Sequence, residues 1–231
     1  MDLVIVESPA KAKTINKYLG KDYRVVSSFG HIRDLPSKKG SVLPEEDFKM
    51  IYEINKGSNK HVDNIVSAAK NANNIYLASD PDREGEAIAW HIIEILKKKK
   101  SIKQDVNFQR ISFHEITKKA VTEAIKSPKQ LNMDLVNAQQ ARRALDYLVG
   151  FNLSPILWRK LPGSRSAGRV QSVALRLICD REEEIERFIS QEYWTIGCKF
   201  EKEKTIFEAK LNKFDGQKVE KFTFANKEST N

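Results

Sequence analysis

The alternation of short apolar runs with amphipathic stretches over residues 1–128 is the feature that most constrains the fold of this chain. Strands are expected at 3–7, 23–29, 74–79 and 107–113, and helices at 10–19, 61–71, 84–95 and 116–125. Strands that alternate with helices favour a parallel sheet joined by right-handed crossovers. The sequence therefore predicts an α/β domain with its functional groups at the carboxyl edge of the sheet.

Three carboxylates occupy alternate positions after the expected strand at 74–79: Asp80, Asp82 and Glu84. An extended segment sends residues i and i+2 to the same side, so Asp80 and Asp82 can converge on one point. Convergent carboxylates repel each other unless a cation joins them, and oxygen ligands without Cys or His favour Mg²⁺ over Zn²⁺. The alternative is that Asp82 or Glu84 only caps the following helix. A calcium loop fits poorly, because His91 stands where its bidentate glutamate belongs.

The first expected strand ends at Glu7, which places another carboxylate at the same sheet edge. Ser8-Pro9 then predicts a helix start, with the serine as N-cap and the proline in the first turn. Lys11 and Lys13 oppose the dipole of that helix unless an anion binds nearby, and helix N-termini bind phosphate well. The alternative is that both lysines simply face solvent.

Other local patterns bear on which ligands the chain can bind. His31 and Arg33 follow the second expected strand, where a phosphate contact and an ordinary turn are both open interpretations. Residues 36–48 are expected to form a loop. The motifs G-x-G-x-x-G after a strand and G-x-x-x-x-G-K-[ST] do not occur, which disfavours dinucleotide and P-loop chemistry.

The charge balance points to a polyanionic partner. The chain has 40 Lys and Arg against 31 Asp and Glu, a net charge of +9, which favours nucleic acid or an anionic membrane surface. Cys179 and Cys198 match neither a metal spacing nor a disulfide framework, which favours the reducing cytoplasm. No apolar run approaches the roughly 20 residues of a membrane span. Strand-like residues at the start also argue against a signal peptide.

From Asp134 the pattern changes to helices. A helix over 137–150 is expected to bury its alanine and leucine side and to expose Arg142, Arg143 and Asp146, as phosphate contacts or as a plain solvated face. A separate short helix is expected from Ser154 to Leu161, followed by a long helix that opens over 164–172. Arg165 and Arg169 at its positive end predict a nucleic-acid contact. Strands are expected at 192–200 and 205–211.

Six stretches resemble, in order, the motifs of the bacterial type IA DNA topoisomerase family: 4–15, 30–36, 78–91, 113–117, 139–143 and 166–172. The resemblance implies a TOPRIM domain over 1–128, which is a mostly parallel Rossmann-like sheet flanked by helices. It implies part of a helical domain that grips single-stranded DNA over 129–190, and the start of a β-rich gate domain over 191–231. The implied protein is monomeric, cytoplasmic and associated with the bacterial nucleoid.

The resemblance also implies a reaction, the relaxation of negatively supercoiled DNA through a transient 5′-phosphotyrosine. Glu7 would exchange a proton with the leaving 3′ oxygen, and Lys11 would stabilise charge on the scissile phosphate. Asp80 and Asp82, with Glu7 or Glu84, would hold Mg²⁺. The residues that would contact DNA are His31, Arg33, Arg142, Arg143, Asp146, Tyr147, Asn152, Arg159, Arg165, Ser166, Gly168, Arg169, Val170, Gln171 and Ser172.

One departure from the family pattern is decisive for the chemistry. The family nucleophile lies in a Thr-Tyr-x-Arg-Thr-Asp-Ser motif, and none of the six tyrosines has that context. No cysteine-rich zinc ribbon follows either. The chain is therefore expected to be the N-terminal part of a longer enzyme and to be inactive alone in strand cleavage. Two alternatives remain open: a TOPRIM nuclease or primase, and a non-catalytic DNA-binding module.

Overall fold

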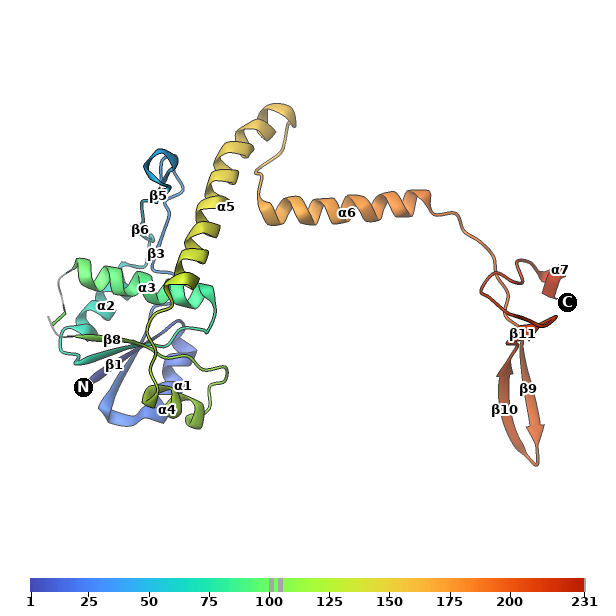
Figure 1. Cartoon of the computed structure of the whole chain (residues 1–231), viewed down its shortest axis with the longest axis horizontal. Helices are drawn as coiled ribbons and strands as arrows, with labels where there is room; N and C mark the ends of the chain where they lie inside the picture. The colour runs from blue at the N-terminus through green and yellow to red at the C-terminus, as the bar shows by residue number, and fades with distance from the viewer. Residues whose placement is uncertain (100–101, 104–105, 231) are drawn as a thin grey trace. The chain divides into compact units, whose positions relative to one another are not determined.

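The computed structural model describes the whole chain except residues 100–101, 104–105 and 231 (Figure 1). It forms two compact units, Met1–Arg169 and Val170–Asn231, and each is described here by itself. This two-part division is coarser than the expected domains at 1–128, 129–190 and 191–231, which stay predictions.

A four-stranded parallel sheet forms the centre of the first unit (Figure 1). Its strands are β1 (Asp2–Val6), β2 (Tyr23–Ser27), β7 (Asn74–Leu77) and β8 (Asn107–Arg110), in the order β2-β1-β7-β8. Ile5 of β1 pairs with Val26 of β2 and with Leu77 of β7. The predicted parallel α/β sheet is confirmed, and its carboxyl edge collects the residues that follow β1, β2 and β7.

Two layers of helices cover the sheet because successive strand residues point to opposite faces. The helices are α1 (Pro9–Leu19), α2 (Asn59–Ala69), α3 (Arg83–Lys98) and α4 (Lys118–Lys126). Leu3 and Ile5 pack with buried residues of α2 and α3, whereas Val4 and Val6 pack with buried residues of α1 and α4. The prediction that the 84–95 helix is largely buried is also confirmed.

The expected loop at 36–48 contains regular structure. β3 (Arg33–Asp34) pairs with β6 (Glu53–Ile54), and β4 (Val42–Leu43) pairs with β5 (Lys49–Met50), both antiparallel. Short 3-10 helices occupy Gly20–Asp22 and Pro44–Glu46. The segment that connects β2 to α2 is therefore a narrow antiparallel projection.

A single helix, α5 (Met133–Lys160), replaces the two helices expected at 137–150 and 154–161. Pro155 lies inside it, although a proline in a helix interior lacks the backbone N–H for one hydrogen bond. The buried side was predicted only in part. Ala144 is buried as expected, but Gln139 and Tyr147 are also buried and Leu145 is exposed. The side of α5 that packs against Leu35 and Val42 carries Tyr147 together with Ala144 and Leu148.

The second unit holds one long helix and two small hairpins. Its elements are α6 (Arg169–Arg187), β9 (Gly197–Lys202), β10 (Thr205–Lys210), β11 (Lys213–Phe214), β12 (Gln217–Lys218) and α7 (Lys227–Thr230). Phe200 and Phe207 face each other across β9 and β10, with ring centroids 5.3 Å apart. The helix begins at Arg169 rather than at residue 164, so Arg165 precedes it instead of lying in its first turn.

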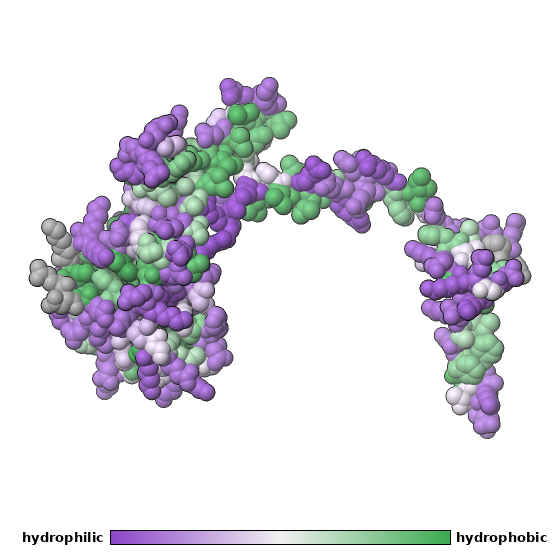
Figure 2. All heavy atoms as spheres, viewed as in Figure 1, coloured by the Kyte–Doolittle hydropathy of each residue, from purple (hydrophilic) through white to green (hydrophobic). Residues whose placement is uncertain are grey.

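The apolar side of α6 is uncovered. Val170, Val173, Leu177 and Ile178 are all more than half exposed, and apolar colour runs along this helix (Figure 2). Within the residues that the structure describes, no helix is long and apolar enough to cross a membrane.

Candidate active site

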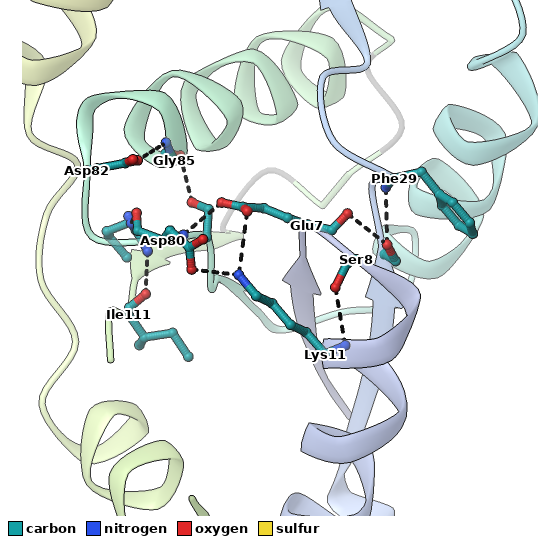
Figure 3. Close-up of polar contacts among 11 residues, drawn as sticks. Glu7, Ser8, Lys11, Phe29, Asp80, Asp82, Gly85 and Ile111 are labelled. Carbon is teal, nitrogen blue, oxygen red and sulfur yellow. Dashed lines mark hydrogen bonds and ion pairs between the residues drawn. The ribbon is translucent and has the colours of Figure 1, made fainter. Parts of the chain in front are cut away.

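A lysine ammonium joins two carboxylates at the carboxyl edge of the sheet (Figure 3). Glu7 directly follows β1, and Asp80 follows β7 by three residues. Lys11 Nζ lies 2.6 Å from Asp80 Oδ1 and 3.5 Å from Glu7 Oε2. The backbone N–H of Asp80 also donates to Glu7 Oε1 at 2.7 Å. The structure therefore brings together three residues that the sequence separates by up to 73 positions.

The start of α1 aims Lys11 at this cluster. Ser8 is the N-cap, and its Oγ accepts a hydrogen bond from the backbone N–H of Lys11 at 3.3 Å, as the Ser8-Pro9 pattern predicted. Partial burial alone would lower the pKa of Lys11, but the hydrogen bond to Asp80 and the charge of Glu7 raise it above its usual value. Lys11 is therefore a cation at physiological pH, and its charge partly compensates that of the two carboxylates.

Asp82 and Glu84 do not join this cluster. Asp82 is the N-cap of α3, where its Oδ1 accepts from the backbone N–H of Gly85 at 2.8 Å. Glu84 Oε1 lies 2.6 Å from Nε2 of His31. Across the described residues, no group of three or more His, Cys, Asp or Glu side chains is arranged to hold a metal ion. Asp80 and Asp82 do not converge here, because the carboxylate of Asp82 is engaged as the N-cap of α3.

Three residues that the sequence did not single out as functional fix the acidic turn. Ser79 Oγ donates to the carbonyl of Gly85 at 2.6 Å. A Cβ on Gly85 would lie 2.1 Å from the carbonyl oxygen of Asp80, so only glycine fits there. Buried Arg110 donates to that same carbonyl at 2.7 Å. The signal that could have revealed Arg110 is its place at the end of β8, beside the turn after β7.

Arg110 is itself held by a buried ion pair. Its Nε lies 2.7 Å from Glu86 Oε1, and both side chains are more than 90% buried. The other oxygen of Glu86 accepts from the backbone N–H of Asn132, which precedes α5. One buried carboxylate thus connects the acidic turn, β8 and the start of α5.

Arg33 lies in an enclosed aromatic cage rather than on an open surface. Its Nε donates to Nδ1 of His91 at 2.8 Å, and its guanidinium carbon lies 4.9 Å from the ring centroids of both Tyr52 and Trp90. Burial, followed by the charge of Arg33, lowers the pKa of His91 to about 3. His91 is therefore neutral and can accept this hydrogen bond.

Two polar contacts attach α5 to the segment after β2. Arg143 makes a bidentate pair with Asp34, with distances of 2.7 and 2.8 Å. Burial alone would raise the pKa of Asp34, but the hydrogen bond from Arg143 holds it below its usual value. The Tyr147 hydroxyl accepts from the backbone N–H of Ser41 at 3.0 Å and donates to the carbonyl of Lys38. Of the expected DNA contacts, Arg143 and Tyr147 therefore already have protein partners.

A groove of about 940 Å³ lies between α5 and the 35–44 segment. The expected DNA contacts that line it are Arg143, Asp146, Tyr147, Asn152 and Ser166.

Several of the expected DNA contacts bond to other parts of the protein. Asp146 is paired with Arg169 at 2.9 and 3.0 Å, and Arg142 approaches it at 3.9 Å. Of the other expected contacts, Arg159 donates to the carbonyl of Pro155 and Arg165 accepts from the indole of Trp158 through its carbonyl. Val170, Gln171 and Ser172 belong to the second unit.

The fold and its carboxylate-bearing edge define a Toprim domain, and the Toprim family model matches residues 2–116. The family model described as DNA topoisomerase matches residues 130–231. Toprim domains of topoisomerases bind metal ions.

Known proteins agree with both matches. The chain is 64% identical to DNA topoisomerase 1 of Rickettsia bellii and 60% identical to that of Xylella fastidiosa, over 98% of this chain and 28% of each relative. It also resembles the structure of full-length topoisomerase I from Thermotoga maritima, with a TM-score of 0.74 and 45% identity over 85% of this chain and 33% of that one. The chain belongs to the bacterial DNA topoisomerase I family. It spans less than a third of the length of the relatives named here.

Proposed function

We propose that this chain supplies the acid–base, metal-binding and part of the DNA-binding machinery of an enzyme that relaxes negatively supercoiled DNA. The observation that carries the proposal is the cluster of Glu7, Lys11 and Asp80 at the sheet edge. A carboxylate beside an ammonium ion is suited to transfer a proton and to bind a phosphate at the same place. The reaction would be a transient break of one DNA strand, with the 5′ phosphate held on a tyrosine.

In this proposal Glu7 and Lys11 have separate tasks. Glu7 gives a proton to the leaving 3′ oxygen and takes it back when the strand is rejoined. Lys11 places its positive charge against the scissile phosphate. The two side chains are 3.5 Å apart, so one bound phosphate can contact both.

The donor set fits Mg²⁺. Asp80 and Asp82, with Glu7 or Glu84, provide only oxygen atoms, the ligands of a hard cation. The ammonium of Lys11 now stands between two of these carboxylates, as a cation in that place would. Mg²⁺ bound there would supply charge stabilisation to the phosphate. Binding needs Asp82 or Glu84 to exchange its present hydrogen bond for the metal.

Thermal unfolding with and without Mg²⁺ tests the metal site. The wild-type chain is expected to gain stability in Mg²⁺, because a ligand that binds only the folded state stabilises it. The variant with Asp80→Asn and Asp82→Asn is expected to lose that gain. Lys38 and Glu53 form a surface ion pair elsewhere, so Glu53→Gln is the control and is expected to keep it. An equal gain in the double variant would rule out the site.

The nucleophile is proposed to lie outside these 231 residues. The hydroxyls of Tyr18, Tyr52 and Tyr147 bond to Ile116, Met50 and the 38–41 segment. Burial is the main cause that raises the pKa of the Tyr52 hydroxyl to about 12. We therefore expect no covalent DNA adduct when the chain is mixed with Mg²⁺ and single-stranded DNA and quenched with denaturant. An adduct would show that the assignment of the nucleophile is wrong.

Single-stranded DNA is the proposed partner. The groove beside α5 carries Arg143 and Asn152, and the net charge of +9 favours a polyanion. We propose a monomer in the cytoplasm, associated with the nucleoid. Fluorescence anisotropy with a labelled oligonucleotide tests the binding, and no binding at low salt would contradict it.

A further inference from the structure

Phe29 is an exposed aromatic side chain held in an unfavourable backbone conformation beside the site. It follows β2 at the carboxyl edge of the sheet, its φ is 59°, and 53% of its surface is exposed. Bulky side chains rarely adopt positive φ, and such residues cluster at ligand sites. Neither burial nor backbone preference accounts for a phenylalanine at this position.

Local hydrogen bonds hold Phe29 in this conformation. Its backbone N–H donates to Ser27 Oγ at 3.1 Å, and the same Oγ donates to the carbonyl of Glu7 at 3.1 Å. The N–H of Gly30 donates to that carbonyl at 2.9 Å. Phe29 is therefore fixed to the backbone of Glu7, while its ring points away from Lys11 (Figure 3).

A second ring stacks against the ring of Phe29. The imidazole of His61, in the first turns of α2, stacks on Phe29 with a centroid distance of 3.9 Å and an interplanar angle of 23°. Helix α2 packs on β2, so the two rings come from elements in contact. Lys60, which is exposed, precedes His61. An aromatic stack with an adjacent cation matches the chemistry of single-stranded nucleic-acid binding.

We infer that the Phe29–His61 pair is a stacking platform for one base of a single-stranded nucleic acid that passes over Glu7. The inference rests on the proposed function, and it adds a contact outside the expected DNA-binding residues. The phosphate near Lys11 and the base on Phe29 would belong to neighbouring nucleotides, because Phe29 is tied to Glu7 through Ser27 and Gly30. Stacking accepts any base, since every base has a π-face.

Oligonucleotides that carry 2-aminopurine test the platform, because stacking quenches the fluorescence of this base. The probe is an oligothymidylate with one 2-aminopurine, whose position is varied along the strand. In the wild-type chain one position is expected to be strongly quenched. Phe29→Leu keeps the apolar volume but has no π-face, so quenching is expected to disappear and the affinity to fall about 5- to 150-fold. Phe29→Tyr is expected to restore both.

Phe48 provides a matched control. It is 56% exposed with a φ of 53°, but it lies in the turn between β4 and β5. Phe48→Leu is expected to leave affinity and quenching unchanged. Unchanged binding in Phe29→Leu, or an equal loss in Phe48→Leu, would overturn the platform while leaving the proposed function intact. A wild-type chain that binds no oligonucleotide would overturn both.

Discussion

At the scale of single residues, Lys11 decides the charge state of the site. Its ammonium occupies the space between Glu7 and Asp80, so the metal-free site already contains a cation. Without it the two carboxylates would face each other uncompensated. Lys11 therefore competes with a divalent ion for Asp80 while also being the group suited to hold a phosphate.

Lys11→Ala tests this competition. The variant is expected to be less stable than wild type in EDTA by roughly 1–3 °C, the scale of a partly exposed ion pair. It is expected to show a larger Mg²⁺-dependent rise in Tm, because the metal no longer displaces an ammonium. Thermal unfolding over a Mg²⁺ titration measures both effects. Lys13→Ala, on the same helix, is the control. A smaller rise in Lys11→Ala than in wild type would contradict the competition.

His91 makes stability depend on pH. Its pKa is about 3 in the folded protein, mainly because it is buried, against roughly 6.5 when unfolded. The unfolded chain therefore binds the proton more tightly, so the contribution of His91 is complete above pH 6.5 and is lost as the pH falls toward 3.

We expect the free energy of unfolding to fall by about 1.4 kcal/mol for each pH unit below 6.5. His91→Gln keeps an acceptor for Arg33 but does not titrate, so it is expected to flatten this dependence between pH 6.5 and 5. Urea unfolding at several pH values measures it. His114→Gln, at a position outside the Arg33 cage, is the control and should keep the wild-type slope. An equal slope in His91→Gln would contradict the assignment.

At the scale of elements, the turn between β7 and α3 is fixed at three points. Ser79, Gly85 and Arg110 hold it through a hydrogen bond, a backbone contact and a buried guanidinium. A turn fixed at three points presents Asp80 in one orientation. The orientation of Asp80 is therefore set by the residues around the turn, together with its backbone hydrogen bond to Glu7.

Gly85→Ala is expected to displace this turn. The new Cβ would lie 2.1 Å from the Asp80 carbonyl oxygen, a backbone atom that cannot swing aside. Overpacking of this kind costs about 1–3 kcal/mol or more, and the Mg²⁺-dependent stabilisation should be lost with it. Gly150→Ala is the control, because the nearest atom would lie 3.8 Å away and alanine suits a helix interior. Thermal unfolding of both variants with and without Mg²⁺ measures the stability and the Mg²⁺ response. A wild-type Mg²⁺ response in Gly85→Ala would contradict the expectation.

The parallel sheet was predictable because strand-like segments, such as the apolar run Leu3–Val6, alternate along the chain with helical segments. The role of Asp82 was harder to predict. Alternate spacing does not reveal that the Asp82 carboxylate caps α3 through the backbone N–H of Gly85. The helical wheel of α5 failed for Tyr147, because hydropathy cannot show that its hydroxyl finds hydrogen-bond partners in the 38–41 segment. A local cap decided the first case, and contacts between distant segments decided the second.

At the scale of the whole molecule, the two units differ in how well they bury their apolar residues. The first has continuous cores on both faces of its sheet. In the second, the apolar side of α6 and the phenylalanines of the β9–β10 hairpin are exposed. The first unit therefore contains what is needed to fold around its own core.

Lys11 also links the binding of a phosphate to the binding of a divalent ion. If a phosphate draws this ammonium away from Asp80, a carboxylate is released for a divalent ion, and an ion that takes the carboxylate releases the ammonium for a phosphate. Binding equilibria linked in this way must enhance each other by the same factor. The factor by which DNA raises the affinity for the ion must equal the factor by which the ion raises the affinity for DNA.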